Sequence, residues 1–182
     1  MEEVYLTKPS LAFEKEILTY RDEFHNPDDP DDHVPGSNML EHFNTVEAWL
    51  NNIKLSESYA TLPDKKYVPS YAYILVKKSN NKILGMSNLR LELNDYLLNF
   101  AGNIGYSIAP SERRKDYGKV LLKKTLLEAK KMGLDRVLLT CDEENIASEK
   151  IIVNNNGIFE NKLYDEDDNC KGYVKRFWIA LI

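Results

Sequence analysis

Apolar positions in this chain follow two periods, and segments of each period alternate along the sequence. A period of two, or a short apolar run, predicts strands at 4–6, 71–76, 83–93, 104–108, 136–140, 158–164 and 173–182. Steps of three and four residues predict helices at about 10–24, after Asn44, from about 119 to 132, and after Asn145. This order of elements indicates an α+β fold with one strand-helix-strand crossover in its second half.

Polar residues mark where the predicted helices begin. Ser10 and Asn145 are expected to be N-caps, and Asn44 with Glu47 has the spacing of a capping box. In the strand predicted at 83–93, leucines alternate with a second set of side chains, Asn88, Arg90 and Glu92. One face of that strand is therefore apolar, and we expect the polar face to line a cleft.

The stretch from Asn103 to Gly118 combines a strand, a basic turn and the start of a helix. Pro110 ends the strand, and the turn Ser111 to Lys115 leads into the helical pattern that Gly133 closes. Unpaired backbone N–H groups and the positive end of the helix dipole meet at such a helix N-terminus. The stretch therefore predicts an anion-binding site.

Composition narrows the class of protein. With 182 residues, 43% of them hydrophobic, the chain can bury one sizeable core, so we expect a single domain over 1–182. The net charge of -5 argues against a general nucleic-acid-binding surface. Cys141 and Cys170 lack metal-ligand spacing and are too few for a disulfide framework. No window has the length and hydrophobicity of a membrane span or secretory leader, so we expect a cytoplasmic protein that binds neither membranes nor metals.

An acidic, proline-rich segment at 26–36 interrupts the regular pattern. It is rich in prolines and aspartates and reads NPDDPDDHVPG. A solvated connection between elements is the simpler interpretation. Alternatively, its aspartates attract a cationic amine; these are Asp28, Asp29, Asp31 and Asp32.

The residues from Arg90 to Gly157 resemble a group of bacterial GCN5-related N-acetyltransferases (GNAT). The acyl-CoA-binding motif of that family is Gln or Arg, two residues, Gly, one residue, then Gly or Ala, and Arg113 and Gly118 match its ends. Further matches are Asn94, Ile104, Gly105, Tyr106, Ser111, Arg114, Lys115, Tyr117, Thr140, Cys141, Asp142, Asn145, Ser148 and Ile152. Four positions depart from the pattern: Asn103 replaces a histidine, Ala109 an arginine, and Asp116 and Asn156 a glycine each.

The resemblance implies the GNAT fold, which is a mixed, mostly antiparallel central sheet flanked by helices. It also implies acetyl-CoA as acyl donor and a small-molecule or peptide amine as acceptor. In the family, backbone N–H groups of the central strand meet the thioester carbonyl and the pantetheine arm; here these are Tyr106, Ser107 and Ile108. In the family, the turn and the helix start hold the diphosphate, and residues at the start of the later, asparagine-capped helix contact CoA. The corresponding residues here are Arg113, Arg114, Lys115, Asp116, Tyr117, Gly118, Lys119, Asn145 and Ser148. Homodimers are common in the family.

Acyl transfer from a thioester to an amine needs a neutral amine, a stabilised oxyanion and a proton for the thiolate. The amine could be made neutral by water or by a polar side chain on the strand face, and Glu92 and Asn103 are the candidates. Many relatives place a tyrosine seven residues after the capping asparagine, but here that position is Ile152, so Ser148 is the candidate that relays a proton. The histidines all lie in the N-terminal third, so one reaches the sheet centre only if a loop folds over it.

Two functional hypotheses follow. In the first, the chain is an acetyl-CoA-dependent N-acetyltransferase in which a primary amine attacks directly within a ternary complex, since no nucleophile for a covalent intermediate is visible. In the second, the chain keeps the fold as a catalytically impaired CoA-binding or protein-interaction module. Asn103, Asp116 and Ile152 favour the second hypothesis, and the extent of the match favours the first.

Overall fold

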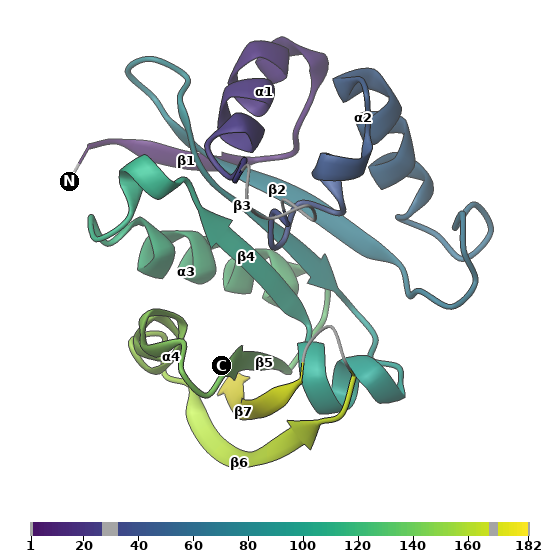
Figure 1. Cartoon of the computed structure of the whole chain (residues 1–182), viewed down its shortest axis with the longest axis vertical. Coiled ribbons are helices and arrows are strands. Elements are labelled where there is room, and N and C mark those ends of the chain that lie inside the picture. The colour runs from purple at the N-terminus through teal and green to yellow at the C-terminus, as the bar shows by residue number, and fades with distance from the viewer. Residues whose placement is uncertain (1, 27–32, 168–170, 182) are drawn as a thin grey trace.

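The computed structural model of the chain describes residues 2–26, 33–167 and 171–181, and within them two antiparallel sheets carry the fold (Figure 1). The first has the order β1-β2-β3-β4 and the second the order β5-β7-β6. The strands are β1 (Val4–Thr7), β2 (Ser70–Lys77), β3 (Ile83–Arg90), β4 (Ile104–Ile108), β5 (Arg136–Asp142), β6 (Ile158–Asp165) and β7 (Gly172–Ala180). The helices are α1 (Glu14–Asp22), α2 (Val46–Leu55), α3 (Tyr117–Lys131) and α4 (Ile146–Val153).

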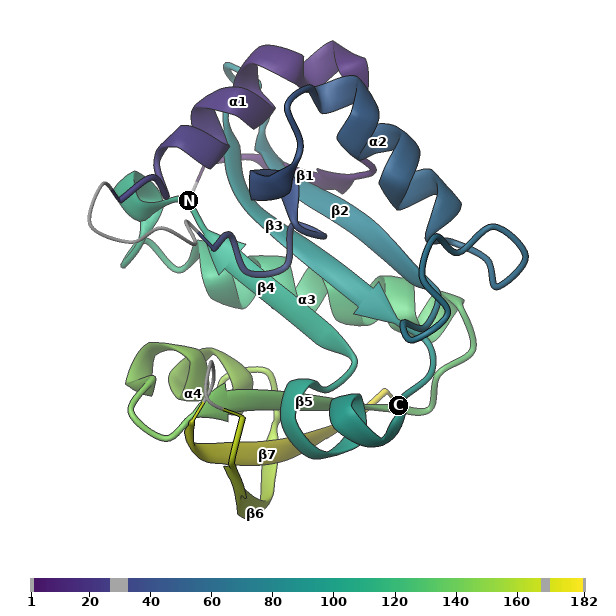
Figure 2. The ribbon, with the colours of Figure 1, turned by 45° about the vertical axis from the view of Figure 1, so that its right-hand side comes forward.

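Helices cover both faces of the first sheet. Along β2, Ala72, Ile74 and Val76 pack in one cluster with Trp49 of α2 and Ile17 of α1. The intervening side chains of β2 point the other way, into clusters that include the buried leucines of α3. This alternation follows from the period of two along a strand. Figure 2 shows the resulting layers, with α1 and α2 over one face of the sheet and α3 behind the other.

The two sheets meet along β4 and β5. Asn103 N donates to Leu138 O at 2.7 Å, and Leu138 N donates to the side-chain Oδ1 of Asn103, also at 2.7 Å. Beyond this join the two strands diverge toward the side on which α4 lies (Figure 2). The side chain of Asn103 thus takes the place of a backbone carbonyl at the closed end of the gap between the two strand backbones, here called the opening.

The element order and the α+β class predicted from the sequence are confirmed, with differences at the ends of elements. Helix α1 begins at Glu14 after a 3-10 turn at Leu11–Phe13, and Ser10 makes no side-chain cap. Thr45, rather than Asn44, caps α2 through a bond from Ala48 N. Strand β3 ends at Arg90, three residues earlier than predicted. Asn145 does cap α4, as expected.

One element that the sequence did not predict is a π-helical turn at Leu97–Ala101. It packs against the second sheet, because Thr140 Oγ1 of β5 donates to Phe100 O at 2.9 Å and Arg176 Nε of β7 donates to Leu98 O at 3.1 Å. Within the described ranges, no helix combines the length and the apolar character needed to cross a membrane.

Candidate active site

Strand β4 presents unequal edges to its two neighbours. Arg90 N donates to Asn103 O and Ala109 N donates to Leu84 O, so odd-numbered residues of β4 direct their backbone groups toward β3. Backbone groups alternate sides along a strand, so those of Tyr106 and Ile108 face the side from which β5 has diverged. The backbone groups of Ser107, by contrast, face β3. Its side-chain hydroxyl donates to Pro35 O at 2.5 Å. Of the three predicted oxyanion and pantetheine contacts, the structure thus directs two toward the opening.

The turn that follows β4 leads into the N-terminus of α3. Arg114 and Asp116 both have left-handed backbones, with φ of 61° and 63°. The first intrahelical bond of α3 runs from Val120 N to Asp116 O at 3.3 Å, so the N–H groups of residues 117–119 precede the helical hydrogen-bond pattern. Asp116 is exposed and its side chain makes no capping bond to these groups. The geometry leaves three backbone donors at the positive end of a fifteen-residue helix.

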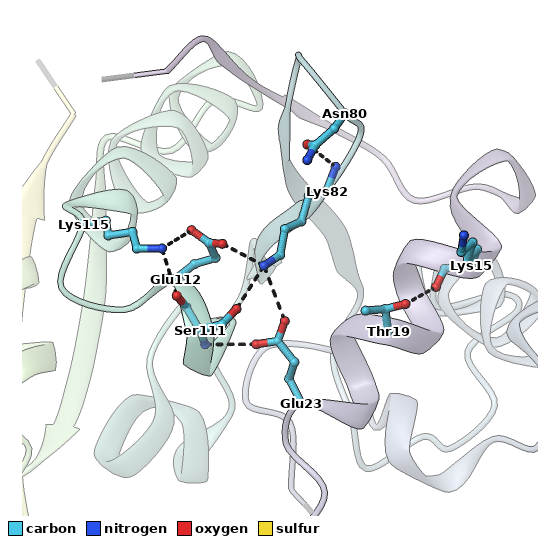
Figure 3. Close-up of polar contacts among 8 residues, drawn as sticks. All are labelled: Lys15, Thr19, Glu23, Asn80, Lys82, Ser111, Glu112 and Lys115. Carbon is cyan, nitrogen blue, oxygen red and sulfur yellow. Dashed lines mark hydrogen bonds and ion pairs between the residues drawn. The ribbon is translucent and has the colours of Figure 1, made fainter.

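A network of charged groups holds this turn against the rest of the fold (Figure 3). Glu112 accepts from Lys82 Nζ at 2.7 Å and from Lys115 Nζ at 2.9 Å, and Ser111 N donates to Glu23 Oε2 at 3.0 Å. The hydrogen bond from Lys82, reinforced by Lys115, holds the pKa of Glu112 below its usual value despite partial burial. The Lys115 ammonium group is therefore paired with Glu112 in this network, and is not directed at the backbone donors of α3.

The basic side chains around the turn differ in what they contact. Arg113 lies over the ring of Phe24 at 5.8 Å, and its Nε donates to Ile108 O at 3.4 Å. Arg113, Arg114 and Lys119 are all exposed. They surround the N-terminus of α3 with positive charge that an anion from solvent can reach.

A pair of hydroxyl groups bridges β4 and α4 across the opening. Tyr106 Oη lies 2.8 Å from Ser148 Oγ, and Ser148 N donates to Asn145 Oδ1 at 3.0 Å, so the cap positions the serine. Burial raises the pKa of Tyr106 above its usual value, although the bond to Ser148 works against the shift. The phenol is therefore protonated at neutral pH and able to donate. Ile152, at the position where relatives have tyrosine, is fully buried in the core.

The two other predicted catalytic residues lie away from this bridge. Asn103 is buried, and besides accepting from Leu138 N it donates from Nδ2 to Arg90 O at 2.9 Å. Both the oxygen and the nitrogen of its side-chain amide are hydrogen-bonded to backbone groups, so its role is structural. Glu92 is exposed beyond the end of β3 and accepts from Tyr59 Oη at 2.9 Å.

A cavity of about 590 Å³ lies on the other side of β4 and reaches the strand at Gly105. It is closed by residues 33–42, which fold over β4. A Cβ on Gly36 would lie 2.6 Å from Gly105 O, so these two backbones approach as closely as glycines allow. Asn88 and Arg90 line the cavity, as expected for the polar face of β3, whereas Glu92 is not among its lining residues.

The same fold-over brings a histidine to the cavity. His33 lines it, and its Nδ1 lies 2.9 Å from Oε1 of Glu41, whose second oxygen accepts from Ser37 Oγ at 3.2 Å. Burial of Glu41 favours a raised pKa, but the bonds from His33 and from backbone N–H groups outweigh it, and the pKa of Glu41 lies below its usual value. The sequence offered no signal for this placement, because it depends on the path of a loop. The neighbouring aspartates at 28, 29, 31 and 32 lie outside the described residues.

Two further kinds of site can be addressed within the described part of the chain. Cys141 is buried, and burial raises the pKa of its thiol to about 11, so it is a packed thiol and not a nucleophile at neutral pH. Among the residues described, no three or more His, Cys, Asp or Glu side chains gather in a way that could hold a metal ion.

Comparison with known proteins identifies the family. A model of the acetyltransferase (GNAT) family matches residues 39–152, which is more than half of the chain. The match covers β4, the turn and all of α3. No curated protein matches the chain.

Solved structures share the fold at low sequence identity. Ribosomal-protein-S5-alanine acetyltransferase from Vibrio fischeri is 16% identical, with a TM-score of 0.71 over 99% of this chain and 94% of that one. An N-acetyltransferase from Staphylococcus aureus Mu50 is 16% identical, with a TM-score of 0.64 over 99% of both chains. Mutant forms of the spermidine/spermine N-acetyltransferase from Vibrio cholerae are 15% identical, with a TM-score of 0.64 over 98% and 95%. The expected GNAT fold is confirmed, and the chain is a member of the GNAT family of N-acetyltransferases.

Proposed function

We propose that this chain transfers the acetyl group of acetyl-CoA to a primary amine by direct attack within a ternary complex. The observation that supports this most directly is the position of β4 between two kinds of site. Its open edge and the N-terminus of α3 lie on one side, and the cavity reaches Gly105 on the other. A donor and an acceptor that used these two sites would meet next to Tyr106.

The donor side offers groups suited to acetyl-CoA. The N–H groups of residues 117–119, with Arg113, Arg114 and Lys119 around them, suit the diphosphate. The N–H groups of Tyr106 and Ile108 face the opening, where they would donate to the thioester carbonyl and the pantetheine arm. Backbone donors need no particular side chain, which is why these roles are compatible with a tyrosine at 106 and an isoleucine at 108.

The transfer itself requires three proton movements. The neutral amine attacks the thioester carbon, its nitrogen loses a proton to water as the amide forms, the carbon–sulfur bond breaks, and the thiolate takes a proton. We assign that proton to the Tyr106 and Ser148 hydroxyl pair, which is protonated and lies beside the opening. The ammonium form of the acceptor must first lose a proton. We assign the removal of that proton to His33, which lines the cavity and whose Nδ1 lies 2.9 Å from Glu41 Oε1.

The experiment combines a binding readout with a chemical one. Acetyl-CoA at a hundred times its Kd should stabilise the native chain by about 2.7 kcal/mol and raise its Tm. Thiol release should then depend on an added amine. Tyr106→Phe and Ser148→Ala should each lower kcat by about a hundredfold while leaving the Tm shift in place. Tyr164→Phe removes an exposed phenol on β6 and serves as the matched control.

The possible outcomes separate the two functional hypotheses. A Tm shift without thiol release across a broad amine panel would favour the CoA-binding module, for which Asp116 in the motif and Ile152 in place of a tyrosine speak. No Tm shift at millimolar acetyl-CoA would contradict both. The single domain, the homodimer and the cytoplasmic location expected from the sequence stay predictions.

A further inference from the structure

Arg90 places a guanidinium group at the cavity that we propose for the acceptor. It is the last residue of β3, and it is partly buried. Nη1 donates to Gly102 O at 3.2 Å, and Nη2 lies 3.8 Å from the point that a Cβ on Gly105 would occupy. Arg90 and Gly105 both line the cavity, and because residue 105 has no side chain, the guanidinium group and the backbone of Gly36 both lie close to this part of β4.

Within the described ranges, no carboxylate offsets this charge. Arg21 and Arg176 each have an acidic partner, Asp22 and Glu160, at 3.2 Å and 2.7 Å. Arg90 has no such ion pair among the described residues, and none of the residues that line the cavity is Asp or Glu. Loss of hydration lowers the pKa of Arg90 to about 10. A charge removed from water in this way normally has a partner of opposite sign.

Of the other polar residues that line the cavity, only Lys66 and His33 can carry charge, and both are exposed; Glu41, the partner of His33, does not line the cavity. Asn88 Nδ2 donates to Asn38 Oδ1, and Asn38 Nδ2 donates to Ser70 Oγ at 3.2 Å, so these side chains form a connected neutral row. Lys66 is exposed and pairs with Asp64 at 3.1 Å. The buried interior of the cavity therefore has positive character that suits an anion and opposes a polyamine.

We propose that the acceptor is a small amine that also carries a carboxylate or phosphate group, and that Arg90 binds this anion. This rests on the proposed acetyl transfer and specifies its substrate class. Guanidinium groups bind both anions through paired N–H donors. The Arg90 head group lies beside Gly105, one residue from Tyr106, so an anion bound there leaves the amine of a compact acceptor near the thioester. The cavity volume of about 590 Å³ fits such a molecule.

The test uses matched acceptors that differ only in the anion. Thiol release from acetyl-CoA is measured with leucine against leucinamide, with β-alanine against propylamine, and with O-phosphoethanolamine against ethanolamine. Spermidine is included as an acceptor without an anion. We expect kcat/KM to be at least about tenfold higher for the anionic member of a pair. The amino acids and the phosphate ester separate the carboxylate and phosphate alternatives.

Substitution of Arg90 assigns the preference to this residue. Arg90→Gln should raise KM for the anionic acceptor by about ten- to hundredfold with a smaller change in kcat, and leave the neutral acceptor nearly unaffected. Arg90→Lys should recover part of the loss. Arg136→Gln removes the same charge from an exposed site over Trp178 on the second sheet and should leave the preference unchanged. Should Arg90→Gln fail to fold, the kcat/KM ratios of the acceptor pairs, measured with the wild-type chain and with Arg90→Lys, still test the proposal.

Binding without turnover provides an independent readout. Calorimetric titration of leucine and O-phosphoethanolamine into the chain saturated with CoA reports the anion site even if no acceptor is acetylated. Binding that Arg90→Gln abolishes, with no thiol release from any amine, would uphold the anion site and reject the proposed transfer. Equal or better turnover of the neutral amines or spermidine, or an absence of anion binding together with an absence of turnover, would overturn the inference.

Discussion

At the scale of single residues, the positions that depart from the family pattern are informative. Asp116 and Asn156 both stand where the pattern has glycine, and both have left-handed backbones, with φ of 63° and 66°. Asp and Asn are the residues that adopt this conformation at the lowest cost after glycine. The two substitutions could be seen in the sequence. The structure shows that both positions keep the left-handed conformation that glycine adopts most easily.

Whether the carboxylate of Asp116 opposes CoA binding is open to a direct test. Asp116→Asn and Asp116→Gly should both lower the Kd of acetyl-CoA, by about threefold to tenfold, because each removes a negative charge beside the expected diphosphate site. Calorimetric titration at two ionic strengths checks this, since the gain should shrink at high salt. A gain with glycine alone would assign the effect to the backbone, and no gain with either would contradict the electrostatic argument.

Residue roles were predictable from sequence only where they depend on close neighbours. The cap at Asn145 bonds to Ser148, three residues further on, and was correctly predicted. Asn103 bonds to Leu138, which lies 35 residues away, and no local pattern announces that contact. Asn88 was expected on a polar strand face, but its contact with Asn38 depends on the path of a loop.

At the scale of elements, periodicity predicted which segments are helices and strands, and local polar chemistry predicted their ends less well. The β3 strand was expected to reach Leu93 because the leucine alternation continues, yet pairing stops at Arg90. The alternation beyond that point belongs to the bend that leads toward the π-helical turn. A pattern records which side chains prefer burial, and it does not record where a partner strand ends.

Close packing of residues 33–42 on β4 shapes the cavity proposed for the acceptor and can be disturbed at one glycine. Gly36→Ala should lower Tm and raise KM for the acceptor, because a Cβ would meet the backbone of residues 105 and 106 at 2.6 Å. Acetyl-CoA affinity should change little. Gly133→Ala is the matched control, since Gly133 also has positive φ but nothing lies within 4 Å. It should cost only the backbone penalty of about 1–2 kcal/mol.

Thermal melting and acceptor kinetics on the two glycine variants provide the comparison. If both variants lose the same stability, the approach of Gly36 to Gly105 contributes nothing beyond backbone conformation. If Gly36→Ala raised the Kd of acetyl-CoA as much as the acceptor KM, the segment would belong to both sites. Either result would contradict a role confined to the acceptor cavity.

At the scale of the whole molecule, the division into two sheets was beyond the reach of sequence patterns. Strands β4 and β5 have the apolar character of neighbouring strands whether or not they stay hydrogen-bonded. Asn103 joins them at one end, where its side-chain oxygen accepts from Leu138 N in place of a backbone carbonyl, and beyond this bond they diverge (Figure 2). One buried amide thus marks the closed end of the opening on which the proposed chemistry depends.

Replacement of that amide separates a structural role from a catalytic one. Asn103→Ala should destabilise the chain, because Leu138 N–H and Arg90 C=O each lose a buried partner at about 1–3 kcal/mol per group. Acetyl-CoA, if it binds across the join, should recover part of the lost Tm. Asn51→Ala, on the exposed face of α2, is the control and should be nearly neutral. A variant with unchanged Tm but a large fall in kcat would instead place Asn103 in the chemistry, as the sequence first suggested. Because the loss is expected in folding and not in turnover, kcat measured well below the Tm of the variant decides between the two.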